Sequence, residues 1–168
     1  MANTYTLIAS STVGSGGAAN IEFTSIPATY TDLLVKYALR DTASGGVVNA
    51  TITFNGSSAN QTQKNIYTDN GSSVTSYSFT DFYIWYPGSS ATASTFGNSE
   101  IYITNYASSN YKSFSGDITS ENNSASGTLA LGASLWSNTA AITSVKVTPN
   151  GGTFAQYSTA YLYGISNS

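Results

Sequence analysis

The chain has 168 residues, and a chain of this length forms one domain that buries roughly two-thirds of the surface of its unfolded state. Charged residues make up 8% of the sequence and the formal net charge is −3, which excludes an electrostatic nucleic-acid binder. There is no Cys and no His, which excludes thiol chemistry, disulfides, the commonest general base and the commonest transition-metal ligand.

The hydrophobic pattern repeats every two residues along most of the chain. Ile21 and Phe23 alternate with polar neighbours, and so do Ala50, Ile52 and Phe54. This alternation is typical of half-buried strands, and no window keeps a three-four spacing over a helical length. In chain order we predict about eleven strands, at residues 5–13, 18–26, 32–41, 47–55, 63–68, 80–86, 97–105, 111–119, 127–136, 141–148 and 157–165.

Turn residues separate these segments. Asn55-Gly56, Asn70-Gly71 and the Asn-Gly-Gly run at 150–152 offer backbone positions with positive φ. Ser/Thr/Asn/Gly-rich stretches at 55–64, 69–79, 87–96 and 120–126 are predicted surface loops. Short strands with frequent turns leave no room for crossover helices. We therefore predict an all-β fold, an antiparallel β-sandwich of jelly-roll-like type, forming a single domain over residues 1–168.

Side chains capable of catalysis are few and dispersed. The acidic residues form no recognisable catalytic pair, and Asp41 and Asp81 lie at strand edges, where an Asp commonly accepts hydrogen bonds from turn amides. The segment TDNGSS (68–73) lacks the later Glu of a calcium loop, so an Asn-Gly turn explains it better. No Gly-x-Ser-x-Gly motif occurs. We predict no enzymatic activity, no catalytic or metal-binding residues and no cofactor.

Aromatic residues, at 13% of the chain, point to contact surfaces. In the run FYIWY (82–86), Phe82, Ile84 and Tyr86 share one face of a strand, while Tyr83 and Trp85 share the other. One face is expected to be core. The other is either covered or forms a platform for a sugar ring or a partner protein. Tyr83, Trp85 and Tyr86 are the candidate partner or glycan contacts.

Three long segments resemble a known group of proteins. They are STVGSGGAANIEFTSIPATYTDLLVKY (11–37), TFGNSEIYITNYASSNYKSFSG (95–116) and SLWSNTAAITSVKVTPNGGTFAQYSTAYLYGI (134–165). In this order they resemble small β-rich virion structural proteins of tailed bacteriophages, many from aquatic hosts. The resemblance implies a place in a virion, and it makes residues 154–165 a final core strand with Leu162 on one face and Tyr161 and Tyr163 on the other.

Within a virion, we predict a capsid decoration (cement) protein, made in the bacterial cytoplasm and bound to the capsid exterior. The weakly charged surface and the lack of a coiled-coil or collagen-like shaft favour this role. Its expected partners are the major capsid protein and copies of itself, in a homotrimer that buries the second aromatic face. No nucleic-acid or membrane partner is expected. The alternative is a host-recognition, carbohydrate-binding module on a tail or head fibre, and a glycan depolymerase is a third hypothesis.

Overall fold

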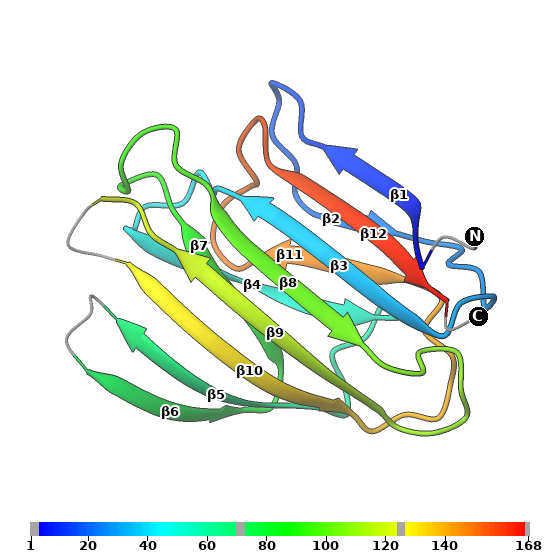
Figure 1. The fold of residues 1–168 in the computed structure, drawn as a ribbon. Helices are drawn as coiled ribbons and strands as arrows, with labels where there is room; N and C mark the ends of the chain where they lie inside the picture. Colours follow the sequence, from blue (N-terminus) through cyan, green and yellow to red (C-terminus); the bar gives the residue numbers. More distant parts are fainter. Residues whose placement is uncertain (1–3, 70–72, 124–126, 167–168) are drawn as a thin grey trace.

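The computed structural model of the chain describes residues 4–69, 73–123 and 127–166. Within these residues the chain forms strands and no helix (Figure 1). The strands are β1 (Tyr5–Thr12), β2 (Ile21–Phe23), β3 (Asp32–Leu39), β4 (Val47–Phe54), β5 (Gln61–Asp69), β6 (Val74–Phe79), β7 (Phe82–Pro87), β8 (Gly97–Ile103), β9 (Lys112–Ser120), β10 (Thr128–Trp136), β11 (Val145–Pro149) and β12 (Thr159–Ile165).

The strands form two packed sheets in which every pairing is antiparallel. One sheet has the order β1-β12-β3-β8-β9-β10-β5-β6, and the other has the order β2-β11-β4-β7. Strands far apart in sequence pair as β1 with β12, β2 with β11, β3 with β8, and β4 with β7, and successive pairs fall alternately in the two sheets. This nested pairing is that of a jelly roll, so the predicted all-β, single-domain antiparallel sandwich is confirmed.

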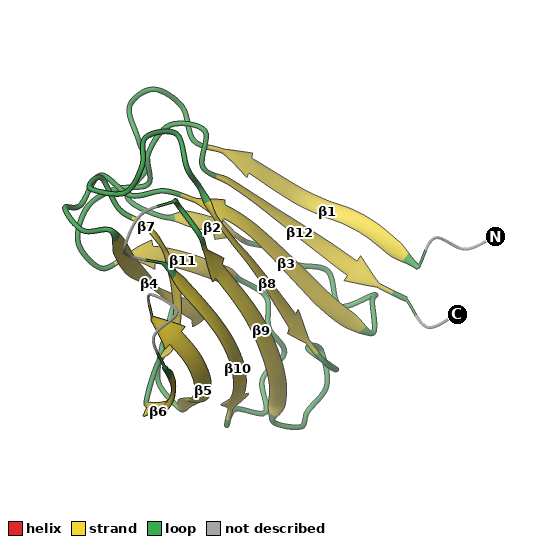
Figure 2. Ribbon diagram, turned by 60° about the vertical axis from the view of Figure 1, so that its left-hand side comes forward, coloured by secondary structure: helices red, strands yellow, loops and turns green. Residues whose placement is uncertain are grey.

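Two hairpins are added to this eight-strand framework. The β5–β6 hairpin lies between β4 and β7 in the chain, and β9–β10 lies between β8 and β11. Both extend the larger sheet beyond β8. As Figure 2 shows, the added strands curve around one end of the molecule, while β1, β12 and the two termini lie at the other. The larger sheet therefore reaches around the β7 edge of the smaller one.

Alternating side chains from both sheets form one core. Phe114 of β9 makes edge-to-face contacts with Phe54 of β4 and Phe82 of β7, with ring centroids 5.3 and 4.9 Å apart. Burying a large apolar side chain contributes about 1.5–3 kcal/mol, so these contacts between sheets are a main source of stability. The inward face of β3 is buried throughout, at Leu33, Val35, Tyr37 and Leu39.

The last strand is an interior strand of the larger sheet, next to its edge strand β1. As predicted, residues 157–165 contain a core strand, β12, which pairs with β1 on one side and β3 on the other. Leu162 is fully buried, whereas Tyr161 on the opposite face is 37% exposed. Gly164 faces the ring of Tyr30, and a Cβ atom at this position would overlap that ring. The close approach of Tyr30 to the sheet therefore requires glycine at 164.

The prediction of a loop at 69–79 is wrong over residues 74–79. Residues Val74–Phe79 form β6, the edge strand of the larger sheet, and β5 begins at Gln61, inside the predicted loop 55–64. The many Ser and Thr residues of this segment predict a loop. It forms a strand in which only one face, with Tyr77 and Phe79, contacts other rings. The predicted strand at 18–26 is shorter than expected, Ile21–Phe23, and the one at 141–148 begins only at Val145.

The predicted turn at Asn55-Gly56 is confirmed. Both residues have positive φ, 51° and 75°, and the backbones of Phe54 and Ser57 exchange two hydrogen bonds around them. This is the geometry of a tight two-residue turn, which Asn-Gly adopts at low cost. The Asn70-Gly71 turn, and with it half of the segment 68–73 compared with a calcium loop, lies outside the described residues.

Candidate functional site

The three residues predicted as contacts separate onto two faces of β7. Tyr83 and Trp85 point away from the core and are half-buried, whereas Tyr86 points inward and is 1% exposed. The Tyr86 hydroxyl donates a hydrogen bond to Asp41 Oδ2 at 3.1 Å, and burial followed by the Asp41 charge raises its pKa far above the usual value. The prediction that Tyr86 is a contact residue is therefore wrong, because its ring belongs to the core.

The outward face of β7 is covered in part by the chain's own β5–β6 hairpin. Gln61 and Gln63 of β5 are buried and reach the backbone of β7. The N–H of Tyr83 donates to Gln63 Oε1 at 3.1 Å, Gln63 Nε2 donates to the carbonyl of Tyr83 at 3.0 Å, and the N–H of Phe82 donates to Gln61 Oε1 at 3.2 Å. These bonds satisfy backbone groups at the start of the free edge of β7, at Phe82 and Tyr83, and hold the hairpin against it.

An aromatic cleft of about 640 Å³ opens where the hairpin meets the smaller sheet. Trp85 lies among the rings of Tyr67, Phe79 and Tyr83, with centroids 6.4, 5.9 and 6.4 Å away. The Tyr67 and Trp85 rings are nearly parallel, at 7°. The aromatic cleft is lined by Val47, Val48, Asn49, Tyr67, Tyr77, Phe79, Tyr83, Trp85, Thr128 and Asn150.

One side of the aromatic cleft is polar and uncharged. Asn150 Nδ2 donates to Asn49 Oδ1 at 2.6 Å, and Thr51 Oγ1 donates to Asn150 Oδ1 at 3.0 Å. Burial, and then the neighbouring Asp81 carboxylate, raise the pKa of Tyr83, so its hydroxyl stays protonated at neutral pH. The lining combines apolar ring surface with neutral hydrogen-bonding groups.

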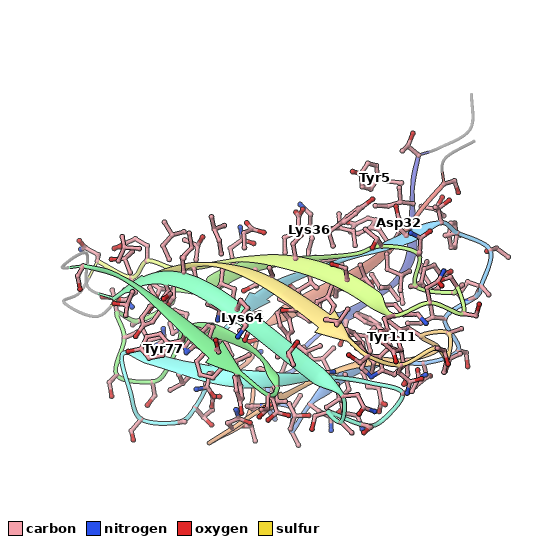
Figure 3. The ribbon with its side chains drawn as sticks, turned by 90° about the horizontal axis from the view of Figure 1, so that it is seen from below. Tyr5, Asp32, Lys36, Lys64, Tyr77 and Tyr111 are labelled. Atoms are coloured by element: carbon pink, nitrogen blue, oxygen red, sulfur yellow. The ribbon has the colours of Figure 1, made fainter. Side chains whose placement is uncertain are left out.

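The outer face of the larger sheet is a second candidate surface, here called the broad face. Leu131 and Ile66 lie opposite each other on β10 and β5 and are 53% and 52% exposed. Tyr5 and Lys36 project from the same side (Figure 3). Three depressions of about 480, 200 and 280 Å³ adjoin along it. Leu131 lines the first and the second, and Glu100 lines the second and the third. The broad face carries Tyr5, Leu7, Leu34, Lys36, Lys64, Ile66, Glu100, Tyr102, Ser115, Asp117, Leu129, Leu131, Tyr161 and Tyr163.

The broad face brings together two acids that the sequence does not pair. Glu100 and Asp117 are directly opposite on β8 and β9. Glu100 also forms an ion pair with Lys36, at 2.7 Å, which raises the pKa of Lys36. A glycosidase needs one carboxyl whose pKa is raised by burial. Here the Glu100 side chain is 39% exposed and neutralised by Lys36, so the pair is better explained as surface electrostatics.

The two buried acids of the described chain are held by structural hydrogen bonds. Asp32 accepts from the Tyr102 hydroxyl at 2.5 Å and from the Asn105 N–H at 2.8 Å. Asp41 accepts from the Ala43 N–H at 2.8 Å, which confirms the predicted turn role of this residue. Among the described residues, no group of three metal-ligating side chains could hold an ion. In the same residues there is no helix that could cross a membrane.

Most of the aromatic cleft was missed from the sequence. Tyr83 and Trp85 were identified from the alternation in β7, but Tyr67, Tyr77 and Phe79 come from the hairpin that was partly read as a loop. The alternation of Tyr77 and Phe79 is the sequence feature that could have indicated strand β6. A scan against protein-family models found no match, and neither did a search of curated protein sequences. The resemblance to tailed-phage virion proteins therefore stays a prediction made from the sequence.

Proposed function

We propose that this chain is a bacteriophage virion structural protein, a capsid decoration (cement) protein that binds the outside of the head and stabilises the shell. The observation that carries the proposal is the broad face. Leu129 and Leu131 of β10 and Ile66 of β5 are each about half exposed on it, next to polar side chains. Scattered exposed apolar residues are normal, but a row of them across adjacent strands favours a protein contact.

The charges on the broad face also suit a protein contact. Lys36 and Glu100 neutralise each other, and the face carries one further charge of each sign, Lys64 and Asp117, so its charges balance. The interior of a protein interface is depleted of charged groups, because uncompensated charges are costly to remove from water. Many copies on one shell would stabilise it through many modest contacts.

The proposed partners are the major capsid protein and further copies of this chain. The trimer expected from the sequence was to bury the second aromatic face, but within the chain the β5–β6 hairpin already packs there. Burial of that face therefore no longer supports a trimer, and the trimer remains a proposal about assembly on the shell. Light scattering of the free protein and of protein released from virions would measure it. We propose the capsid exterior as the site of action, with no nucleic acid or membrane bound and no enzymatic activity.

The test is binding of purified protein to heads of the encoding phage from which the gene has been deleted. Leu131→Lys should weaken binding at least about tenfold, because it replaces an apolar side chain of the contact with a charged one that must be removed from water. Tyr111→Lys is the matched control, since Tyr111 is 59% exposed in the loop before β9 and should bind as the unaltered protein does. Failure of the unaltered protein to bind such heads, or equal binding by Leu131→Lys with an unchanged melting temperature, would contradict the proposal.

A further inference from the structure

We infer that the aromatic cleft binds a neutral glycan, with a pyranose ring stacked against Trp85. This function is separate from capsid binding, which we assign to the broad face on the larger sheet. A decoration protein with such a site would also attach the particle to polysaccharide. The inference depends on four features of the cleft: its size, its rings, its amides and its bonded backbone at Tyr83.

The size and exposure of the aromatic cleft fit a small ligand. Its volume of about 640 Å³ is within the usual range of ligand pockets. Tyr77 is 45% exposed at the cleft, and Tyr67, Phe79, Tyr83 and Trp85 are only partly buried. Their rings contact one another, yet ring surface is left facing water. Partly exposed aromatic side chains of this kind combine a large apolar area with a polar tip.

The ring arrangement suits a sugar. Trp85 contacts rings from β5, β6 and its own strand, so its plane is fixed by packing. The Tyr67 ring packs beside it and is nearly parallel to it, at 7°, so the Trp85 ring is held in place before any ligand binds. A rigid, preformed surface lowers the entropic cost of binding. The C–H face of a pyranose is apolar and flat, and it matches such a surface.

The amides supply the hydrogen bonds that sugar hydroxyls need. The contacts from Asn150 to Asn49 and from Thr51 to Asn150 fix the orientation of both side-chain amides. Among the described residues, no hydrogen bond engages Asn49 Nδ2, which is left to donate to a ligand. Amide groups can donate and accept, as hydroxyls do. No Lys, Arg, Asp or Glu is among the described residues that line the cleft, and the nearby Asp81 carboxylate accepts from the Tyr83 hydroxyl at 3.4 Å, so the expected ligand is uncharged.

The bonded backbone of β7 at Tyr83 argues against a peptide as the occupant. An extended peptide usually binds beside a sheet by pairing with free backbone groups of an edge strand. At the cleft, the N–H and C=O of Tyr83 are already bonded to Gln63. A peptide here would find no backbone partner on that residue, whereas a sugar needs only the rings and the amides.

The test is affinity electrophoresis of the purified protein in gels that contain one polysaccharide each. The neutral probes are laminarin, dextran, xylan and mannan, and the anionic probes are alginate and heparin. At least one neutral probe should retard the protein, and the anionic probes should not. Trp85→Ala and Asn49→Ala should each weaken the retardation about tenfold, whereas Tyr161→Ala, on the broad face, should leave it unchanged.

A second measurement uses the unaltered protein and so does not depend on whether Trp85→Ala folds. The other tryptophan, Trp136, is 2% exposed, so a soluble quencher such as acrylamide should report mainly on Trp85. The retarding polysaccharide should protect this fluorescence. If no neutral polysaccharide retards or protects the protein, or if only anionic ones do, the inference is overturned. Retention of capsid binding in Trp85→Ala would show that the two functions are independent.

Discussion

At the scale of single residues, buried polar side chains tie the loops to the sandwich, and Lys112 is the clearest case. It is fully buried at the start of β9. Its ammonium donates to the carbonyl oxygens of Ser108, Asn138 and Ala140 at 2.8, 3.2 and 2.5 Å, and lies 5.5 Å from the centre of the Trp136 ring. One side chain thus joins the loop before β9 to the loop after β10.

Replacement of Lys112 by Met should lower the free energy of unfolding by about 3 kcal/mol, because three carbonyl groups would lose a charged donor inside the protein. Chemical denaturation would measure the loss. Lys64→Met is the matched control, because the Lys64 side chain is on the exposed broad face, and it should change the free energy by less than about 0.5 kcal/mol. A Lys112→Met protein as stable as the control would show that the contacts contribute little.

Tyrosine hydroxyls make the fold sensitive to alkaline pH. The hydrogen bond to Asp32, and then burial, raise the pKa of Tyr102 from 10.0 to about 12, and burial raises the pKa of Tyr37 and Tyr86 as well. The folded state therefore holds these protons more tightly than the unfolded state. The resulting stabilisation is complete below about pH 10 and is lost as the pH rises through the folded-state pKa.

Urea unfolding over a series of alkaline pH values would show this decline, and tyrosinate absorbance would show when the phenols ionise. Tyr102→Phe should reduce the slope of stability against pH above the pKa of free tyrosine, while leaving the slope at neutral pH unchanged. A slope equal to that of the unaltered protein would mean that the bond to Asp32 does not hold the proton.

At the scale of elements, the β5–β6 hairpin is what turns an exposed strand edge into a site. It supplies the glutamines that bond to the start of β7, and three of the five rings of the aromatic cleft. Gly132 of β10 lies beside Gln63 and Asn65 of β5. A Cβ atom at position 132 would come within 2.7 Å of Asn65 Oδ1 and 3.3 Å of Gln63 Nε2. The neighbouring strand therefore leaves room for them.

Gln63→Leu tests this role. It should cost about 2 kcal/mol, because the N–H and C=O of Tyr83 would each lose a partner. It should also promote self-association, since it frees part of the β7 edge. Thermal unfolding and light scattering would measure the two effects. Thr62→Leu, on the exposed face of the same strand, is the control, and an equal effect in both variants would contradict the assignment.

How well each element could be predicted depends on how much of it is packed. In β3 and β12, apolar residues alternate over the whole strand, so both were identified, as was the jelly-roll type of the fold. In β6, with the pattern VTSYSF, five of six residues are exposed, so its alternation is nearly hidden. Tyr83 and Trp85 were found from local pattern, but the rings and amides that complete the cleft are far away in sequence.

At the scale of the whole molecule, the protein presents two surfaces, which adjoin at Tyr77 of β6. The broad face belongs to the larger sheet, and the aromatic cleft lies where that sheet curls around the smaller one. Both are built on the strands of one jelly-roll core. A protein that binds a shell with one surface and a polysaccharide with the other must keep the second exposed when the first is occupied.

Cryo-electron microscopy of intact virions of the encoding phage is the most direct test of the central claim that the protein acts as a structural component of the head. We predict density for this jelly roll at many symmetry-related positions outside the shell, with the broad face toward the capsid and the aromatic cleft toward solvent. Absence of the protein from the particle, or its presence in only a few copies on the tail, would contradict the account.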